Sequence, residues 1–257
     1  LPAAHVRKNA QQTSLLHKLT ETFVDTETVC VIDHMYGGGA NSYRDKRISE
    51  LLSSGQNVLL ITWNFFRNRL IVKTFLKKNN REEITLEFQM DNLEDLLGYH
   101  FVKFNRIIIN ELVLWSATVE RKQLNTYEAL PKLLKIVEQL ASRDKAELEV
   151  LVHDYYAICP SYCLLDNKGQ FCGAVENSTQ CNNCLRKSAL DIPAKFDVRL
   201  WREAWQTCFN LASVVRFFSQ SSLEIMRKIY MLEAEKVVVV PHQPLTCWSE
   251  TYQIPQT

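Results

Sequence analysis

The stretch VCVIDHMYGGGANSYRDKRISELLSSGQNVLLIT, residues 29–62, decides the expected fold. It opens with a short apolar run, 29–33, of the kind found in buried strands. Three consecutive glycines follow, and then a helical pattern over 42–53 that ends at Gly55. A second apolar run, 58–62, completes the unit. The pattern predicts strand, glycine loop, helix and strand, which is the unit from which parallel sheets are built.

The rest of the chain repeats this rhythm after an interruption by two alternating runs that predict a hairpin insert. We therefore expect an α/β protein with a Rossmann-like, doubly wound, mostly parallel sheet of about six buried strands, a hairpin insert and a cysteine-rich loop. The further elements expected are helices at 10–24, 93–97, 127–140, 198–211 and 222–230, hairpin strands at 70–75 and 84–88, and buried strands at 107–109, 148–153, 213–218 and 237–240.

Composition excludes several classes of function. Thirty basic side chains against 29 acidic ones leave a net charge of +1, so the 257-residue chain has no bulk field for a phosphate backbone, and nucleic acid is not expected as a partner. The apolar runs are far shorter than the ~20 residues that cross a bilayer, so no transmembrane segment is expected. We expect one main domain, 1–242, with 243–257 as a linker leading out of it, and a cytoplasmic location in a reducing compartment.

The glycine loop is the first candidate site, because ligands of open α/β sheets bind beyond the carboxyl ends of the strands. Gly37, Gly38, Gly39, Ala40 and Asn41 lie between a strand and a helix, where backbone amides can approach a phosphate or a sugar. These five residues are the predicted substrate-binding residues. A glycine turn needed only for tight packing of strand against helix is the alternative.

An unrelated dinucleotide-binding enzyme is a weaker alternative for the same loop. The nicotinamide fingerprint needs a third glycine where Ser42 stands, and an acidic residue at the end of the second strand, where 61–64 hold none. Both features are missing here.

His153 and Asp154 follow the strand expected at 148–153 and should face the same cleft as the glycine loop. An imidazole there can donate to a substrate hydroxyl or stabilise developing charge, and the adjacent carboxylate can bind a hydroxyl. The sequence predicts both as catalytic residues. The alternative is a structural histidine at a strand end.

Four of the eight cysteines form the third candidate site: Cys159, Cys172, Cys181 and Cys184, within the loop 155–190. A loop of this length needs something to organise it, and the pair at 181 and 184 is spaced as in a zinc knuckle. We expect a structural zinc ion and no catalytic metal, because four thiolates leave no open position for water. An iron–sulfur cluster, free thiols or one disulfide are the alternatives, and Cys163 is a substitute for the first ligand.

With these residues in view, the chain resembles the N-terminal half of a retaining glycosyltransferase of the GT-B fold, from the large family of bacterial polysaccharide and lipid glycosyltransferases. Four motifs carry the resemblance: GGGANSYR at 37–44, HDYYAICP at 153–160, RFFSQSS at 216–222 and VVVVPH at 237–242.

The resemblance implies transfer of a hexose from a nucleotide diphosphate sugar to a carbohydrate or lipid-linked acceptor, with retention of configuration. This half would bind mainly the acceptor, with Gly38 and Gly39 near the donor diphosphate and His153 near the reacting sugar. It also implies a partner domain C-terminal to this one, little activity without that domain, and a place at the inner face of the membrane. The competing hypothesis is a zinc-organised protein-interaction module without catalytic activity.

Overall fold

The computed structural model describes residues 27–64, 69–78, 81–90, 102–113, 115, 117–119, 122–124, 126–190 and 192–242. The expected helices at 10–24 and 93–97 and the expected linker 243–257 lie outside these residues.

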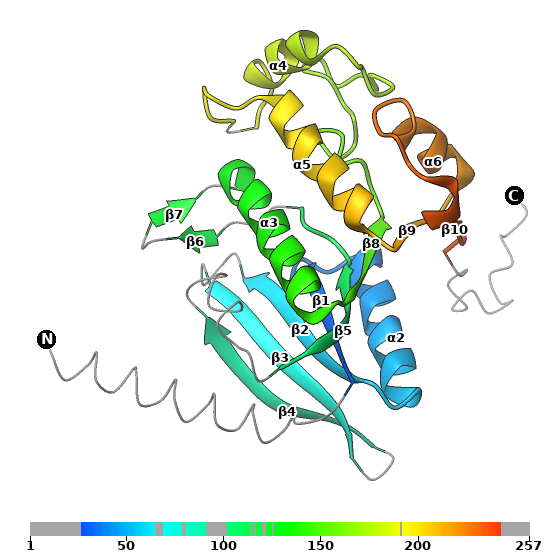
Figure 1. The fold of residues 1–257 in the computed structure, drawn as a ribbon. Helices are drawn as coiled ribbons and strands as arrows, with labels where there is room; N and C mark the ends of the chain where they lie inside the picture. Colours follow the sequence, from blue (N-terminus) through cyan, green and yellow to red (C-terminus); the bar gives the residue numbers. More distant parts are fainter. Residues whose placement is uncertain are drawn as a thin grey trace, which may run out of the picture.

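An eight-stranded sheet forms the centre of the molecule (Figure 1). β1 pairs in parallel with β2 on one side and with β5 on the other, and β8, β9 and β10 continue in parallel beyond β5. The protein is therefore an α/β protein with a mostly parallel sheet, as the sequence predicts. The strand order is β10 (Val237–Val239), β9 (Val214–Phe217), β8 (Glu147–Val152), β5 (Phe104–Ile109), β1 (Thr28–His34), β2 (Asn57–Asn64), β3 (Arg69–Lys78) and β4 (Arg81–Met90).

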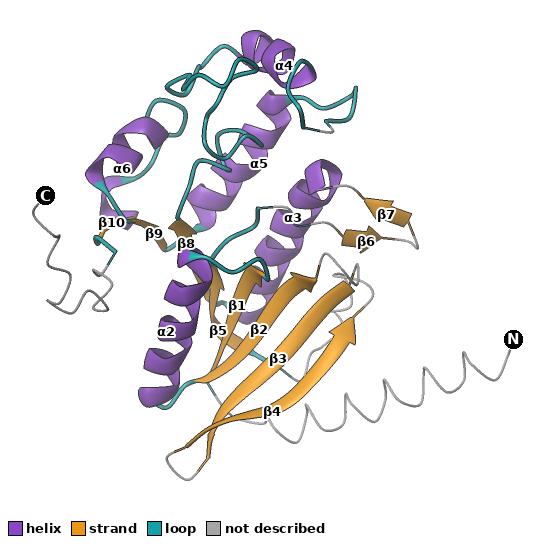
Figure 2. Ribbon diagram, turned by 180° about the vertical axis from the view of Figure 1, so that it is seen from behind, coloured by secondary structure: helices purple, strands orange, loops and turns teal. Residues whose placement is uncertain are grey.

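The predicted hairpin is present, but it is part of the main sheet and not a separate insert. β3 pairs antiparallel with β2, and β4 pairs antiparallel with β3, so the hairpin extends the sheet to its edge (Figure 2). Burial along β3 fits this position, because Leu70, Ile71 and Val72 are all buried. Lys73 is partly exposed and pairs with Glu87 on β4.

Helices cover both faces of the sheet. α2 (Gly39–Ser53) packs on one face against Val29 and Val31, while α3 (Thr126–Asp144) and α5 (Val198–Leu211) pack on the other against Cys30 and Ile32. This division follows from the alternation of side chains along β1, which is buried on both faces. Within the described ranges, every helix is too short or too polar to cross a lipid bilayer.

The structure also contains elements that the sequence pattern did not indicate. A two-stranded sheet joins β6 (Ala117–Val119) to β7 (Lys122–Leu124), and the cysteine-rich loop contains α4 (Ser178–Arg186). The side chain of Asn177 caps α4 by accepting a hydrogen bond from the amide of Gln180. The helix expected at 222–230 is the shorter α6 (Gln220–Met226), which begins where Ser219 caps it.

The packing of α3 gives a direct test of the fold. Leu140 is fully buried in the core, whereas Lys135 on the same helix is exposed. Leu140→Ala should lower the free energy of unfolding by about 2 to 5 kcal/mol, because it leaves a cavity, and Lys135→Ala should change it by less than about 0.5 kcal/mol. Chemical denaturation measures both. Equal effects of the two substitutions would show that α3 does not pack on the sheet as described.

Candidate functional site

The carboxyl ends of β1, β5 and β8 meet at one edge of the sheet. The strands β1 and β5 are neighbours at the centre of the sheet. The chain continues from β1 to β2 on one side and from β5 to β8 on the other, so the two connections run in opposite directions along the sheet. Such a switch point is where open α/β sheets bind ligands. The glycine loop follows β1, Asn110 and Glu111 follow β5, and the predicted pair His153 and Asp154 follows β8. The structure therefore brings the first two predicted site segments to one edge.

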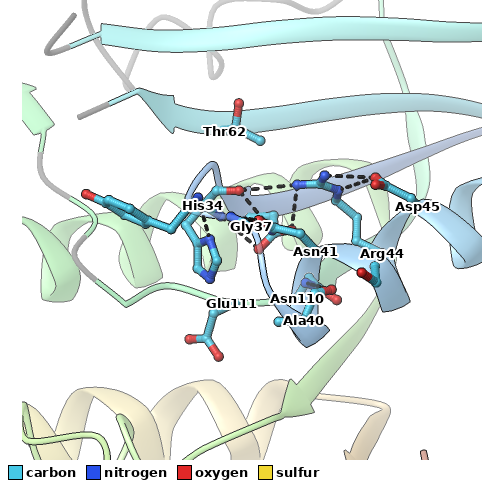
Figure 3. Close-up of polar contacts among 12 residues, drawn as sticks. His34, Gly37, Ala40, Asn41, Arg44, Asp45, Thr62, Asn110 and Glu111 are labelled. Carbon is cyan, nitrogen blue, oxygen red and sulfur yellow. Dashed lines mark hydrogen bonds and ion pairs between the residues drawn. The ribbon is translucent and has the colours of Figure 1, made fainter. Parts of the chain in front are cut away.

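Asp33, at the end of β1, organises this edge. Its buried carboxylate accepts hydrogen bonds from the amide of His34 at 2.8 Å, from Nδ2 of Asn41 at 2.7 Å and from Nη1 of Arg44 at 2.9 Å (Figure 3). Its backbone carbonyl accepts from Nε1 of Trp115 at 2.8 Å. Burial raises the pKa of Asp33, while the guanidinium of Arg44 acts to lower it. The strand end is thereby held to the first turns of α2.

Asn41 holds the glycine loop against the strand. Its side chain accepts a hydrogen bond from the amide of Gly37 and donates to the carbonyl of His34. Gly37 and Gly38 have φ values of 86° and 85°, which only glycine adopts without strain. A Cβ atom built on Gly37, Gly38 or Gly39 would meet no heavy atom within 4 Å. The loop therefore turns an open backbone surface away from the body of the protein.

α2 begins directly on this loop. Its N-cap is Gly38, which has no side chain to satisfy the first amides, and its first turn carries no acidic residue. The amides of Gly39, Ala40 and Asn41 have no acceptor within the helix, as in the first turn of any α-helix. The site therefore presents unsatisfied donors together with the positive end of a helix dipole.

His153 is partly buried beside Asn110 at the ends of β8 and β5. Asn110 donates from Nδ2 to the carbonyl of Ala40 at 3.1 Å, so its Oδ1 is an acceptor. It lies 3.3 Å from Nε2 of His153, which must therefore be the donor. Nδ1 of His153 is buried without a partner among the described residues. Burial and the nearby His242 and His34 lower the pKa of His153 to about 3, so the imidazole is neutral at physiological pH.

An aromatic stack covers His153. Its ring stacks on Phe218 with centroids 4.5 Å apart, and Phe218 stacks on His242 at 3.9 Å. The edge of Tyr43, from α2, packs against all three rings. The motifs at 216–222 and 237–242 are therefore brought to the same edge as the glycine loop, and the rings cover part of the imidazole.

Two further carboxyl groups lie beneath this edge. Glu111 is 8% exposed and accepts hydrogen bonds from the amides of Leu112 and Val113. Asp154 accepts from the amide of Tyr156 at 2.8 Å. Burial and the neighbouring Asp154 raise the pKa of Glu111 well above its usual range, and burial raises that of Asp154 to about 6.

The four predicted metal-ligating cysteines line a cavity of about 240 Å³, apart from the strand-end site. Cys181 and Cys184 lie one turn apart on α4, and Arg202 of α5 contacts Cys181 Sγ at 3.5 Å while donating to the carbonyls of Val175 and Ile158. Cys163 is exposed and does not line the cavity. The structure thus brings the four predicted cysteines together, and Cys163 lies outside this cavity.

The structure does not show a preformed metal centre. Among the described residues, no group of three or more His, Cys, Asp or Glu side chains is placed to hold a metal ion. The cysteines of the cavity are free thiols in this structure, and burial raises the pKa of Cys159 to about 12. Structural zinc and an iron–sulfur cluster therefore remain predictions without support from the geometry.

Several residues of the strand-end site were not predicted. Asp33, Arg44, Asn110 and Glu111 complete it, and each has only a modest sequence signal. Asp33 ends an apolar strand with a charge, and Asn110 and Glu111 are the first polar residues after the apolar run 107–109. A polar residue directly after a buried strand is the pattern that could have found them.

Comparison with known proteins gives no family. No family model matches the chain, and no curated protein matches it. Among solved structures, a secreted C11 cysteine protease from Bacteroides thetaiotaomicron, "iotapain", matches with a TM-score of 0.29 and 11% identity over 50% of this chain and 46% of the protease. The C11 protease in complex with an irreversible peptide inhibitor matches with a TM-score of 0.25 and 9% identity over 48% and 41%. The match thus spans less than half of the protease, and similarity this low does not assign peptidase activity.

These findings correct the family prediction. The structures matched are of a cysteine protease and not of a glycosyltransferase, and the other two comparisons find nothing. The resemblance to a retaining GT-B glycosyltransferase is therefore wrong, and so are the hexosyltransferase activity and the acceptor-binding role inferred from it. The alternative of a zinc-organised interaction module has no support among the described side chains, where no metal-holding group is found. The short motifs misled because strand-end glycines and histidines recur in unrelated α/β proteins.

Metal analysis of the purified protein tests whether the four cysteines bind zinc. If zinc binds, the purified protein should contain about one zinc per chain, and a Cys181→Ser, Cys184→Ser double variant should lose it, because thiolates are the ligands. Cys163→Ser is the matched control and should keep the metal. Elemental analysis after dialysis against a weak chelator makes the measurement. Protein that carries neither zinc nor iron would end the prediction.

Proposed function

We propose that the protein binds a phosphate-bearing small molecule at the switch point of the sheet, with the phosphate on the glycine loop and the start of α2. One observation carries the proposal: an uncapped helix N-terminus stands on an open glycine loop at the edge where the central strands diverge. Backbone amides and the helix dipole favour an anion in such a place.

The loop is preorganised for this role. Asn41 ties Gly37 to the strand end, and Arg44 holds the same carboxylate of Asp33, so the free amides need no rearrangement before they bind. Little ordering entropy is then lost on binding. The ion pair with Arg44 also reduces the repulsion that the Asp33 carboxylate would exert on an anion.

The part of the ligand beyond its phosphate would extend toward β5 and β8. Asn110 and His153 lie there, and both are neutral groups that hydrogen-bond hydroxyls. In this proposal the glycine-loop residues keep their predicted binding role, whereas His153, which was predicted as catalytic, binds the ligand. Asp154, also predicted as catalytic, has no role in it, because Asp154 lines the cavity below the edge.

Gly39→Ala is the sharpest test of the phosphate site. Gly39 has no positive φ and its added methyl group meets no protein atom within 4 Å, so the substitution should leave the fold intact and raise the free energy of unfolding by about 0.4 to 1 kcal/mol. The methyl group would occupy the space in which the phosphate approaches the amides. We expect binding to weaken at least tenfold, or about 1.4 kcal/mol.

Calorimetric titration with inorganic phosphate, a nucleoside diphosphate, a sugar phosphate and an uncharged sugar makes the measurement. Lys46→Ala, at an exposed position two turns along the same helix, controls for general attraction of anions and should bind like the wild type. The proposal fails if the wild type binds none of the phosphate compounds, or if Gly39→Ala binds them with unchanged affinity.

A further inference from the structure

A small cavity lies between the ends of β5 and β8 and the inner face of α5. Its volume is about 20 Å³, which is enough for one water molecule. The polar residues around it include Glu111, His153 and Asp154 from the strand ends, and Trp205 comes from the helix. The lining of the cavity is mostly apolar, and these few polar groups are set among core residues.

Trp205 brings an unpaired donor to this cavity. The residue is 5% exposed, and its Nε1 is buried without a hydrogen-bond partner among the described residues. On the same helix, Nε1 of Trp201 donates to the carbonyl of Tyr156 at 2.9 Å. A buried indole N–H normally has a partner, because leaving it unpaired costs free energy. His153 brings an unpaired acceptor to the same cavity, since its buried Nδ1 has no hydrogen-bond partner among the described residues.

Among the residues that the structure describes, no cation lies beside the two carboxyl groups at the cavity. No ion pair involves Glu111 or Asp154 within the described part of the chain, whereas Asp33 pairs with Arg44. Each carboxyl does accept amide hydrogen bonds on one oxygen. Two carboxylates that line one small cavity repel each other, which favours protonation of one of them.

We propose that this cavity is an internal hydration site, in which one water molecule accepts a hydrogen bond from Trp205 Nε1 and donates to Glu111 and Asp154, which hold one proton between them. The water satisfies the unpaired indole donor, and the shared proton removes the repulsion between the carboxyls. The hydration site is independent of the proposed phosphate site, because it uses no group of the glycine loop.

The sign of the pH dependence follows from the raised pKa values of both carboxyls. The folded protein keeps protons that the unfolded chain releases at about pH 4, so the stabilisation from the pair is complete below that pH and is lost as the pH rises through 6 and above. The other titratable groups facing the pair from neighbouring segments are Asp33, His34, His153, Tyr156 and His242. His153 stays neutral throughout this range.

Thermal unfolding between about pH 4 and pH 8 tests the shared proton. The unfolding temperatures of Glu111→Gln and Asp154→Asn should each rise relative to that of the wild type as the pH increases, because the amide needs no proton. Glu235→Gln, at an exposed position, is the control and should follow the wild type. If both carboxyl variants keep the pH slope of the wild type, the shared proton is excluded.

Proton NMR tests the water itself in the wild-type protein. The Nε1–H of Trp205, assigned through the backbone or by its loss in Trp205→Phe, should show a cross-peak to a long-lived water. The Nε1–H of Trp201, which donates to a carbonyl, should show none. Absence of a water contact at Trp205 would overturn the hydration site whatever the pH experiment gives, and its presence would establish the site even if a variant does not fold.

Discussion

The buried carboxylate of Asp33 is the constraint on which the strand-end site depends. It closes a strand that is buried on both faces, and an unpaired charge there would be costly. The protein satisfies it from the chain that follows, through the amide of His34 and the side chains of Asn41 and Arg44. Because those partners lie on the loop and on α2, satisfying one carboxylate also sets the path of the glycine loop.

The consequences extend to the neighbouring strands. Asn110, at the end of β5, donates to the first turn of α2 and accepts from His153 at the end of β8. These bonds fix the tautomer of His153, and the stack with Phe218 and His242 packs on its ring. Below it, Glu111 and Asp154 form a second polar layer in contact with α5. The edge is thus polar in two layers, an open one with free amides and a buried one that holds a proton.

The sequence predicted the strands and helices of the sheet because burial on both faces leaves continuous apolar runs, as in 29–33 and 107–109. It placed the glycine loop and His153 at one edge for the same reason. It could not predict α4, whose existence depends on an Asn177 cap and on packing against α5, nor which polar groups pair, since Asp33 and Arg44 are eleven residues apart. The family resemblance failed because it rested on short motifs. Such motifs indicate the end of a strand in many α/β proteins, but they do not indicate a particular activity.

The central claim is that the amides at the start of α2 bind a phosphate. Titration of labelled protein with a nucleoside diphosphate, followed through its backbone amide resonances, tests this most directly. We expect the largest shifts at Gly38, Gly39, Ala40 and Asn41, and these shifts should saturate together. The claim would be contradicted if these amides stay unchanged while the resonances of another surface move.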